Sequence, residues 1–146
     1  MKQKWVDYYI DIAERTSLLS TAKKLKVGAV IVKDNRILSI GYNGTPSGWD
    51  NDCEDEYQYE DGGYEMRTKK EVIHAERNAL DKIAKSTESS DGASLFVTHT
   101  PCVECAKSIY NTGITTVYYK FNYDGTTGSG IDFLKKAGVN VCHHGH

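Results

Sequence analysis

Two short motifs contain the side chains that could do chemistry. The first reads H-A-E at residues 74–76, and the second reads P-C-V-E-C at residues 101–105. Cys102 and Cys105 are three positions apart, which places both sulfurs on one face of a helical turn. With the neutral imidazole of His74 they offer three ligands to zinc, one fewer than a structural zinc site has. The motifs therefore predict a catalytic zinc with an open position for water, and Glu76, which is not a ligand, as the proton shuttle.

Each motif is weak by itself. A C-x-x-C pair is also typical of a redox pair or of half a structural zinc site, and H-x-E occurs by chance on many helices. Here both motifs stand at predicted helix starts, and Pro101 suits the first position of a helix. Together they match the H-x-E…P-C-x-x-C signature of zinc-dependent nucleobase deaminases. The redox alternative predicts a reversible disulfide without zinc, so metal content distinguishes the two.

Composition indicates a soluble globular protein. A length of 146 residues fits one domain, which we take to be residues 1–146. The 18 Lys and Arg residues against 20 Asp and Glu residues leave a net charge of -2, which weighs against a nucleic-acid partner. No apolar run approaches the roughly 20 residues of a membrane span, and the N-terminal segment does not resemble a secretory signal. We therefore expect a cytoplasmic protein that does not bind membranes.

The elements that must position the two motifs alternate along the chain. Apolar residues at helical spacing predict helices over about 3–19, 72–83, 102–112 and 131–137. Strands are predicted at 27–32, 37–42, 93–98, 114–119 and 139–142, the first two as a hairpin, with one long polar loop over 41–63. Helical crossovers make the last three strands parallel. The predicted fold is α/β, a three-layer α-β-α sandwich with a mixed five-stranded sheet, and its ligand site lies near the helix starts.

Four stretches of the chain carry a resemblance to a known family. They read V-G-A-V-I-V at 27–32, G-Y-N-G-T-P-S-G at 41–48, H-A-E-R-N-A at 74–79 and T-P-C-V-E-C-A-K at 100–107. The chain resembles the cytidine/deoxycytidylate deaminase superfamily, and the stretch 41–48 resembles its deoxycytidylate (dCMP) branch. This implies hydrolysis of dCMP to dUMP and ammonia with one catalytic zinc per subunit. The alternatives are a deaminase of a free nucleoside or tRNA base, and an inactive zinc-stabilised binding module.

The resemblance also assigns substrate contacts. The base is assigned to the backbone N–H of Ala75 and the carbonyl of Thr100, and the sugar to Asn43. Tyr123, followed by Asp124, lies in a loop where the family has a substrate-contacting tyrosine. The phosphate is assigned by alignment to Ser20, Thr21 and Lys24, where the family pattern S-T-C-x-R reads S-T-A-K-K. Lysine keeps the charge of the family's arginine and loses its bidentate fork, which leaves the phosphate contact open.

Regulation is implied by the same resemblance. Many members are homohexamers that dCTP with Mg²⁺ activates and dTTP inhibits. The effector is expected at six residues of the loop, namely Gly41, Tyr42, Asn43, Gly44, Pro46 and Gly48. The glycines would let backbone N–H groups approach phosphates. The acidic run 54–56 could hold magnesium, and we interpret it as solvated loop charge.

The remaining cysteines and the C-terminal histidines are expected to lie outside the zinc site. Some relatives bind a second, structural zinc through a cysteine at the position of Ala22 and one matching Cys53. Because alanine stands at position 22, we expect one zinc, with Cys53 and Cys142 as unpaired thiols. The histidines within residues 143–146 are interpreted as a frayed terminus rather than a metal site.

Overall fold

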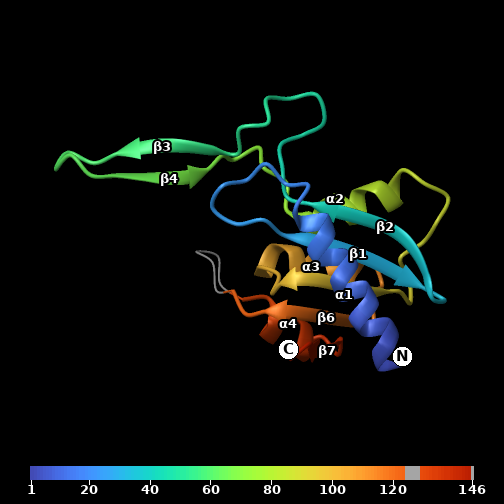
Figure 1. Cartoon of the computed structure of the whole chain (residues 1–146). Coiled ribbons are helices and arrows are strands. Elements are labelled where there is room, and N and C mark those ends of the chain that lie inside the picture. The colour runs from blue at the N-terminus through green and yellow to red at the C-terminus, as the bar shows by residue number, and fades with distance from the viewer. Residues whose placement is uncertain (124–128, 146) are drawn as a thin grey trace.

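A mixed five-stranded sheet forms the centre of the protein in a computed structural model that describes residues 1–123 and 129–145 (Figure 1). Asp124 and His146, named in the sequence analysis, lie outside the described residues. The strands follow one another in the order β2-β1-β5-β6-β7. Their bounds are β1 Gly28–Lys33, β2 Arg36–Tyr42, β5 Ser94–His99, β6 Thr116–Phe121 and β7 Asn140–His143. β1 is antiparallel to both β2 and β5, whereas β5, β6 and β7 are parallel, which confirms the predicted mixed sheet.

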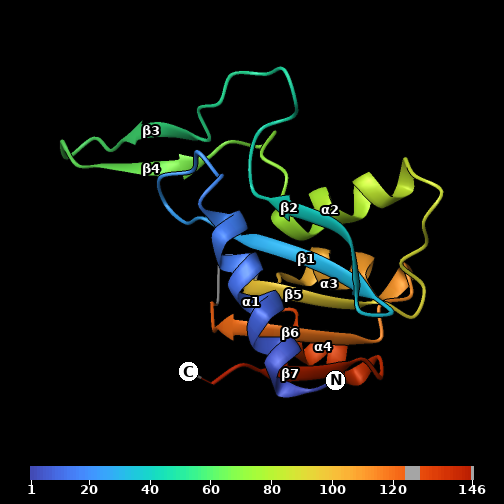
Figure 2. The ribbon, with the colours of Figure 1, turned by 45° about the vertical axis from the view of Figure 1, so that its right-hand side comes forward.

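Helices cover both faces of this sheet. They are α1 Gln3–Ser17, α2 Ala75–Ala84, α3 Val103–Asn111 and α4 Ile131–Lys136. Along β1, Val30 and Val32 pack in the cluster that contains α1, whereas Ala29 and Ile31 pack with residues of α2, α3 and α4. Side chains alternate between the faces of a strand, so β1 is buried on both sides. The predicted three-layer α-β-α sandwich is confirmed, and Figure 2 shows α1 lying across one face.

A two-stranded hairpin begins inside the predicted loop 41–63 and ends in the stretch after it, for which no element was predicted. β3 (Glu54–Gln58) pairs antiparallel with β4 (Tyr64–Thr68). At its tip, the N–H of Tyr59 donates to the carbonyl of Gly63 over 2.7 Å, and Gly62 adopts a φ of +91°. Almost all of its residues are exposed, so no buried face produces the apolar alternation by which strands are recognised. The hairpin projects from the body in both views (Figures 1 and 2).

The C-terminal segment is ordered against the body, so the expectation of a frayed terminus is wrong for its first two histidines. His143 belongs to β7, and its Nε2 lies 2.8 Å from the carbonyl of Lys120. His144 is buried, and its Nε2 lies 2.7 Å from a carboxylate oxygen of Asp7 on α1. β7 pairs in parallel with β6 and extends one residue beyond the predicted strand 139–142, to His143. No helix in the described ranges is both long and apolar enough to cross a membrane.

We expect Gly41→Ala to destabilise the fold, because Gly41 lets α2 approach β2 closely. A Cβ there would lie 2.3 Å from the carbonyl oxygen of Ala75 and 2.6 Å from the nitrogen of Ala79, both backbone atoms. Overpacking of this kind typically costs about 1–3 kcal/mol. Urea unfolding measures the loss. Gly44→Ala is the matched control, since a Cβ there meets its nearest atom at 4.0 Å; equal stability of the two variants would contradict the prediction.

Candidate active site

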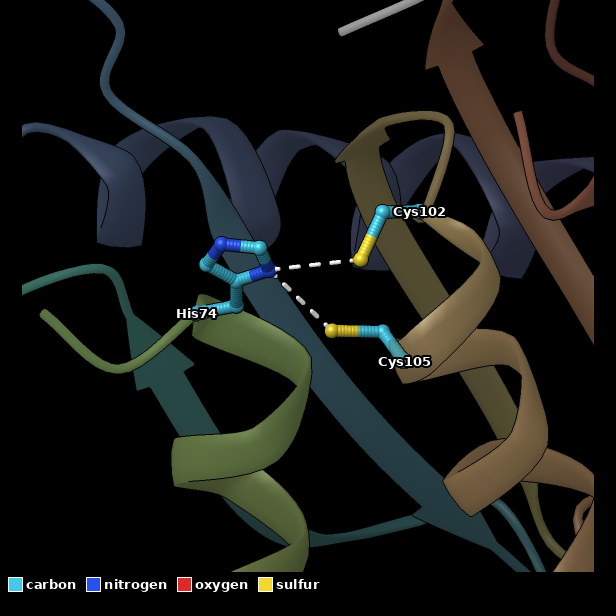
Figure 3. Close-up of side chains that lie close together, drawn as sticks. All are labelled: His74, Cys102 and Cys105. Atoms are coloured by element: carbon cyan, nitrogen blue, oxygen red, sulfur yellow. Dashed lines mark hydrogen bonds between the residues drawn. The ribbon is translucent and has the colours of Figure 1, made fainter. Parts of the chain in front are cut away.

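Three potential metal ligands come together at the starts of two helices. His74 is the N-cap residue of α2 and Cys102 that of α3, with Cys105 in the first turn of α3. Nδ1 of His74 lies 3.2 Å from the sulfur of Cys105 and 3.5 Å from the sulfur of Cys102 (Figure 3). Zinc bonds of about 2.0 Å to nitrogen and 2.3 Å to sulfur predict roughly 3.5 Å between these atoms in a tetrahedral site. The three side chains therefore fit a zinc ion.

Backbone contacts hold the segments that carry these ligands. Before α2, Ile73 and Gly44 exchange N–H to carbonyl bonds of 2.8 and 3.1 Å, which anchor the approach to His74. Before α3, the carbonyl of Pro101 accepts a 2.6 Å hydrogen bond from the N–H of Gly130. The sequence placed Pro101 at the first position of a helix; α3 instead begins at Val103. The segment before the helix thus makes tertiary contacts in place of a further helical turn.

The two thiols share a proton. A hydrogen bond from Cys105 lowers the pKa of Cys102 to about 3, and a further hydrogen bond to His74 acts in the same direction. The same interaction raises the pKa of Cys105 above its ordinary value, and the hydrogen bond with Cys102 raises the pKa of His74. These hydrogen bonds thus favour the thiolate form of Cys102. Such a soft, anionic donor set suits a thiophilic cation such as zinc.

Glu76 lies beside this cluster in the first turn of α2. Its side chain is buried, and burial raises the pKa of its carboxyl above the ordinary value. Among the described residues, the grouping of possible ligand atoms within 4.8 Å of one another contains His74, Cys102 and Cys105 without Glu76. A carboxyl group with a raised pKa next to a metal can both take up and release a proton near neutral pH. The position therefore suits the predicted proton shuttle.

A cavity of about 470 Å³ opens over His74, Glu76 and Cys102. Several residues predicted to contact substrate line it, namely Lys24, Asn43, Ala75, Thr100 and Tyr123. Ser20 and Thr21 are outside this lining. The hydroxyl of Ser20 donates to the carbonyl of Asn43 over 2.7 Å, and that of Thr21 donates to the carbonyl of Asn51 over 2.6 Å. Their assignment to the phosphate stays a prediction. Both hydroxyls already donate hydrogen bonds to backbone carbonyls of the segment after β2.

Two of the lining residues are held by local hydrogen bonds. The amide of Asn43 accepts from the N–H of Val27 over 2.9 Å and donates to the carbonyl of Leu25 over 2.8 Å. The hydroxyl of Thr100 donates to the carbonyl of Tyr123 over 2.7 Å and accepts from its N–H over 2.8 Å. These bonds fix Asn43 against the start of β1 and keep Tyr123 at the cavity. A contact of Asn43 with sugar, as predicted, would use its remaining hydrogen-bonding capacity.

The glycines of the predicted effector loop have structural tasks that the sequence analysis did not foresee. Gly41 lies in β2 against α2, and the N–H of Gly44 already donates to the carbonyl of Ile73. The assignment of these residues to an effector stays a prediction, and the N–H of Gly44 already has a backbone partner. The structural reason for a glycine at position 48 is its backbone conformation, because its φ of +86° is one that glycine adopts more readily than other residues. Tyr42 and Pro46 contribute backbone carbonyls, which accept from the side chain of Asn78 and from the N–H of Trp49.

Glu54 was interpreted as solvated loop charge, and the structure corrects this. Its side chain is buried, and its carboxylate accepts hydrogen bonds of 3.0 and 3.2 Å from the backbone N–H groups of Lys23 and Lys24. The first residue of β3 therefore ties the hairpin to the loop that precedes β1. Cys53, next to it, carries a free buried thiol 3.5 Å from the hydroxyl of Thr21, and Cys142 is a free exposed thiol.

Three titratable residues of the cavity wall escaped the sequence analysis, namely Glu65, Arg67 and His99. His99 ends β5, two positions before Pro101, and its Nδ1 lies 2.8 Å from the hydroxyl of Thr98. Burial lowers the pKa of His99, which favours the neutral ring. Its place at the carboxyl end of a central strand could have indicated a site residue. Glu65 and Arg67 lay within the segments left without an assigned strand.

This site on this fold is typical of one class of enzymes. A His-Cys-Cys cluster with a buried glutamate beside it, at helix starts on a three-layer α/β sandwich, is the arrangement of zinc-dependent base deaminases. Residues 3–121 match the family described as cytidine and deoxycytidylate deaminase zinc-binding region. The chain belongs to this family, as its four sequence stretches predicted.

Relatives and solved structures agree with this assignment. The crystal structure of the dCMP deaminase of cyanophage S-TIM5, in complex with dCMP and dUMP, is 46% identical, covers 98% of both chains and superposes with a TM-score of 0.84. The ComE operon protein 2 of Bacillus subtilis is 39% identical over 94% of this chain and 69% of its own. The deoxycytidylate deaminase of Enterobacteria phage T4 is 33% identical over 90% of this chain and 86% of its own.

Proposed function

We propose that the protein catalyses the hydrolytic deamination of dCMP to dUMP with release of ammonia. The observation that carries the proposal is the cavity, which is lined by His74 and Cys102 of the candidate metal cluster, by Glu76, and by two cationic side chains, Lys24 and Arg67. The candidate metal ligands and Glu76 suit the attack of water on a nucleobase, and the two cationic side chains suit the binding of a phosphate. The similarity to a cyanophage dCMP deaminase solved with dCMP and dUMP supports this substrate.

The reaction exchanges one bond for another at C4 of the cytosine ring. A C–O bond forms with the oxygen of water, the C–N bond to the exocyclic amine breaks, and ammonia leaves. Zinc held by the cluster supplies the Lewis acidity that makes water nucleophilic at neutral pH. Glu76 takes one proton of the attacking water and passes it to N3; it then takes the proton of the new hydroxyl at C4 and delivers it to the departing amine, as the C4 carbonyl forms.

Groups around Glu76 orient the base. Ala75 opens α2, so its backbone N–H has no partner within the helix and can donate to the carbonyl oxygen of the base. The carbonyl of Thr100 accepts from the exocyclic amine, which directs the leaving nitrogen towards Glu76. His99 and Tyr123, whose rings stand edge to face with centroids 6.3 Å apart, form part of the aromatic wall.

We also propose that nucleotides regulate the enzyme. We infer a homohexamer that dCTP with Mg²⁺ activates and dTTP inhibits, on the resemblance of residues 41–48 to the dCMP branch. An effector that activates must bind the active state more tightly than the inactive one. Turnover without dCTP is then expected to be sigmoidal in dCMP concentration.

Ammonia release from five substrates tests the proposal. We expect dCMP to be turned over fastest when dCMP, CMP, deoxycytidine, cytidine and a tRNA are compared side by side, with dCTP-Mg²⁺ raising the rate and dTTP lowering it. Preference for a nucleoside or the tRNA would overturn the substrate assignment and keep the zinc chemistry. A zinc-loaded protein that is inactive on all five would favour the binding module.

A further inference from the structure

The hairpin brings an arginine to the cavity. Glu65 and Arg67 are two positions apart on β4, so their side chains lie on the same face of the strand, and both line the cavity. The guanidinium of Arg67 stacks on the ring of Tyr57, with its Cζ 3.6 Å from the ring centroid. Its Nε donates to the carboxylate of Glu65. The arginine is thus held in place by a ring beneath it and a carboxylate at its edge.

The backbone at Lys24 is tied to the start of the hairpin by Glu54. Glu54 binds the backbone N–H groups of Lys23 and Lys24, and Glu54 is paired in register with Thr68, the neighbour of Arg67. Lys24 and Arg67 both line the cavity. Lys24 is also close enough to Glu65 to contribute to lowering the pKa of its carboxyl, after the larger effects of Arg67 and Tyr59. The carboxylate of Glu65 therefore lies near two cationic side chains, those of Arg67 and Lys24.

Two backbone N–H groups of the loop before β1 are already engaged at this junction. The N–H groups of Lys23 and Lys24 both donate to Glu54, a carboxylate that occupies the position an anionic ligand would take. At this part of the cavity wall, the cationic side chains are therefore the candidate donors to an anion. Arginine has five N–H donors in a planar fork that matches phosphate oxygens, and Glu65 engages it at Nε. A phosphate dianion carries more charge than the carboxylate and is the stronger partner.

We propose that Arg67, together with Lys24, binds the 5′-phosphate of the mononucleotide, and that Glu65 holds the guanidinium until the phosphate displaces it. This rests on the proposed function for the identity of the substrate. Arg67 supplies the bidentate fork that was lost when lysine took the place of the family's arginine at position 24. Glu65 acts as an internal competitor, so it lowers the affinity for a monophosphate without affecting a nucleoside.

Steady-state kinetics on dCMP and deoxycytidine test this assignment. For Arg67→Gln we expect kcat/KM for dCMP to fall about 10- to 100-fold, as for loss of a charge-assisted contact, and kcat/KM for deoxycytidine to stay unchanged. For Glu65→Gln we expect a rise of about two- to fivefold with dCMP alone. In the Arg67→Gln background, Glu65→Gln is expected to have no effect. Arg67→Lys, which keeps the charge, is expected to lie between wild type and Arg67→Gln.

A second exposed ion pair provides matched controls. Arg36 and Glu88 are joined over 3.3 Å, and neither lines the cavity. Arg36→Gln and Glu88→Gln change the net charge in the same way and are expected to leave both substrates unaffected. If Arg67→Gln lowers both substrates equally, or if the Arg36 control reproduces its effect, Arg67 is structural and the inference is wrong.

Direct binding separates this inference from the proposed function. Calorimetric titration with dUMP and with inorganic phosphate is expected to show weaker binding to Arg67→Gln than to wild type. If wild type deaminates none of the substrates yet binds dUMP through Arg67, the proposed function fails and the phosphate site stands. If wild type turns over dCMP and Arg67→Gln does so equally well, the function stands and the phosphate site fails.

Discussion

Replacing Glu76 with alanine is expected to lower kcat on dCMP by about 10²- to 10⁴-fold while zinc content stays at that of wild type. The size of the loss is that of a positioned general acid and base. Zinc is retained because His74, Cys102 and Cys105 form the ligand cluster without this carboxylate. Turnover and metal content, measured on the same preparation, check the two halves of the prediction.

The isosteric variant Glu76→Gln controls for packing. The side chain is buried, so alanine leaves a cavity as well as removing the carboxyl group. Glutamine keeps the volume and cannot exchange the proton, so its turnover is expected to be as low as that of alanine. Loss of zinc from Glu76→Gln would show that the carboxylate is a ligand, and near-normal turnover would remove it from the mechanism.

Cys105→Ala is expected to abolish both metal binding and turnover, and to destabilise the protein. The variant keeps only two of the three candidate ligands, His74 and Cys102, which are expected to bind zinc too weakly to retain it. A metal that binds the folded chain and not the unfolded chain adds its binding free energy to the stability of the fold. At a zinc concentration of 1,000 times the dissociation constant this linkage is worth about 4 kcal/mol. Metal analysis and thermal unfolding with and without added zinc measure the two losses.

Cys142→Ala is the matched control for that variant. Cys142 carries the same thiol on β7, where it is free and exposed. This change is expected to leave zinc content, turnover and the response of thermal stability to zinc as in wild type. A Cys105→Ala protein with full zinc and full activity would contradict the ligand assignment. A reversible disulfide between Cys102 and Cys105 in a zinc-free, active wild type would support the redox alternative instead.

Most of the fold was predictable because its elements are short and strongly patterned. β1 is apolar throughout, since its Ala29 and Ile31 pack on one side and its Val30 and Val32 on the other. Helical spacing identified all four helices, with bounds that shifted by at most about three residues. The hairpin β3–β4 was missed because its residues are exposed, so nothing but backbone pairing and its turn marks it as strand.

The candidate site was predictable where chemistry restricts residue type and spacing. The two motifs contain His74, Glu76, Cys102 and Cys105, and the structure brings them to one place. The phosphate assignment of the loop before β1 stays a prediction. Lys24 lines the cavity, whereas the hydroxyl of Ser20 donates to the backbone carbonyl of Asn43, a tertiary contact that the local sequence does not indicate.

The class of fold could be predicted from the amino-acid sequence because it depends on local periodicity, and the candidate zinc ligands and candidate proton shuttle could be named because they are a few residue types at short spacing. Only the tertiary structure decided what surrounds them. It showed that Glu54 is buried against the loop before β1, that His144 contacts Asp7, and that Arg67 reaches the cavity. Each of these features depends on residues from separate elements of the fold, so a local sequence pattern cannot predict it. The packing of the hairpin, the loop and the helices decides which residues meet.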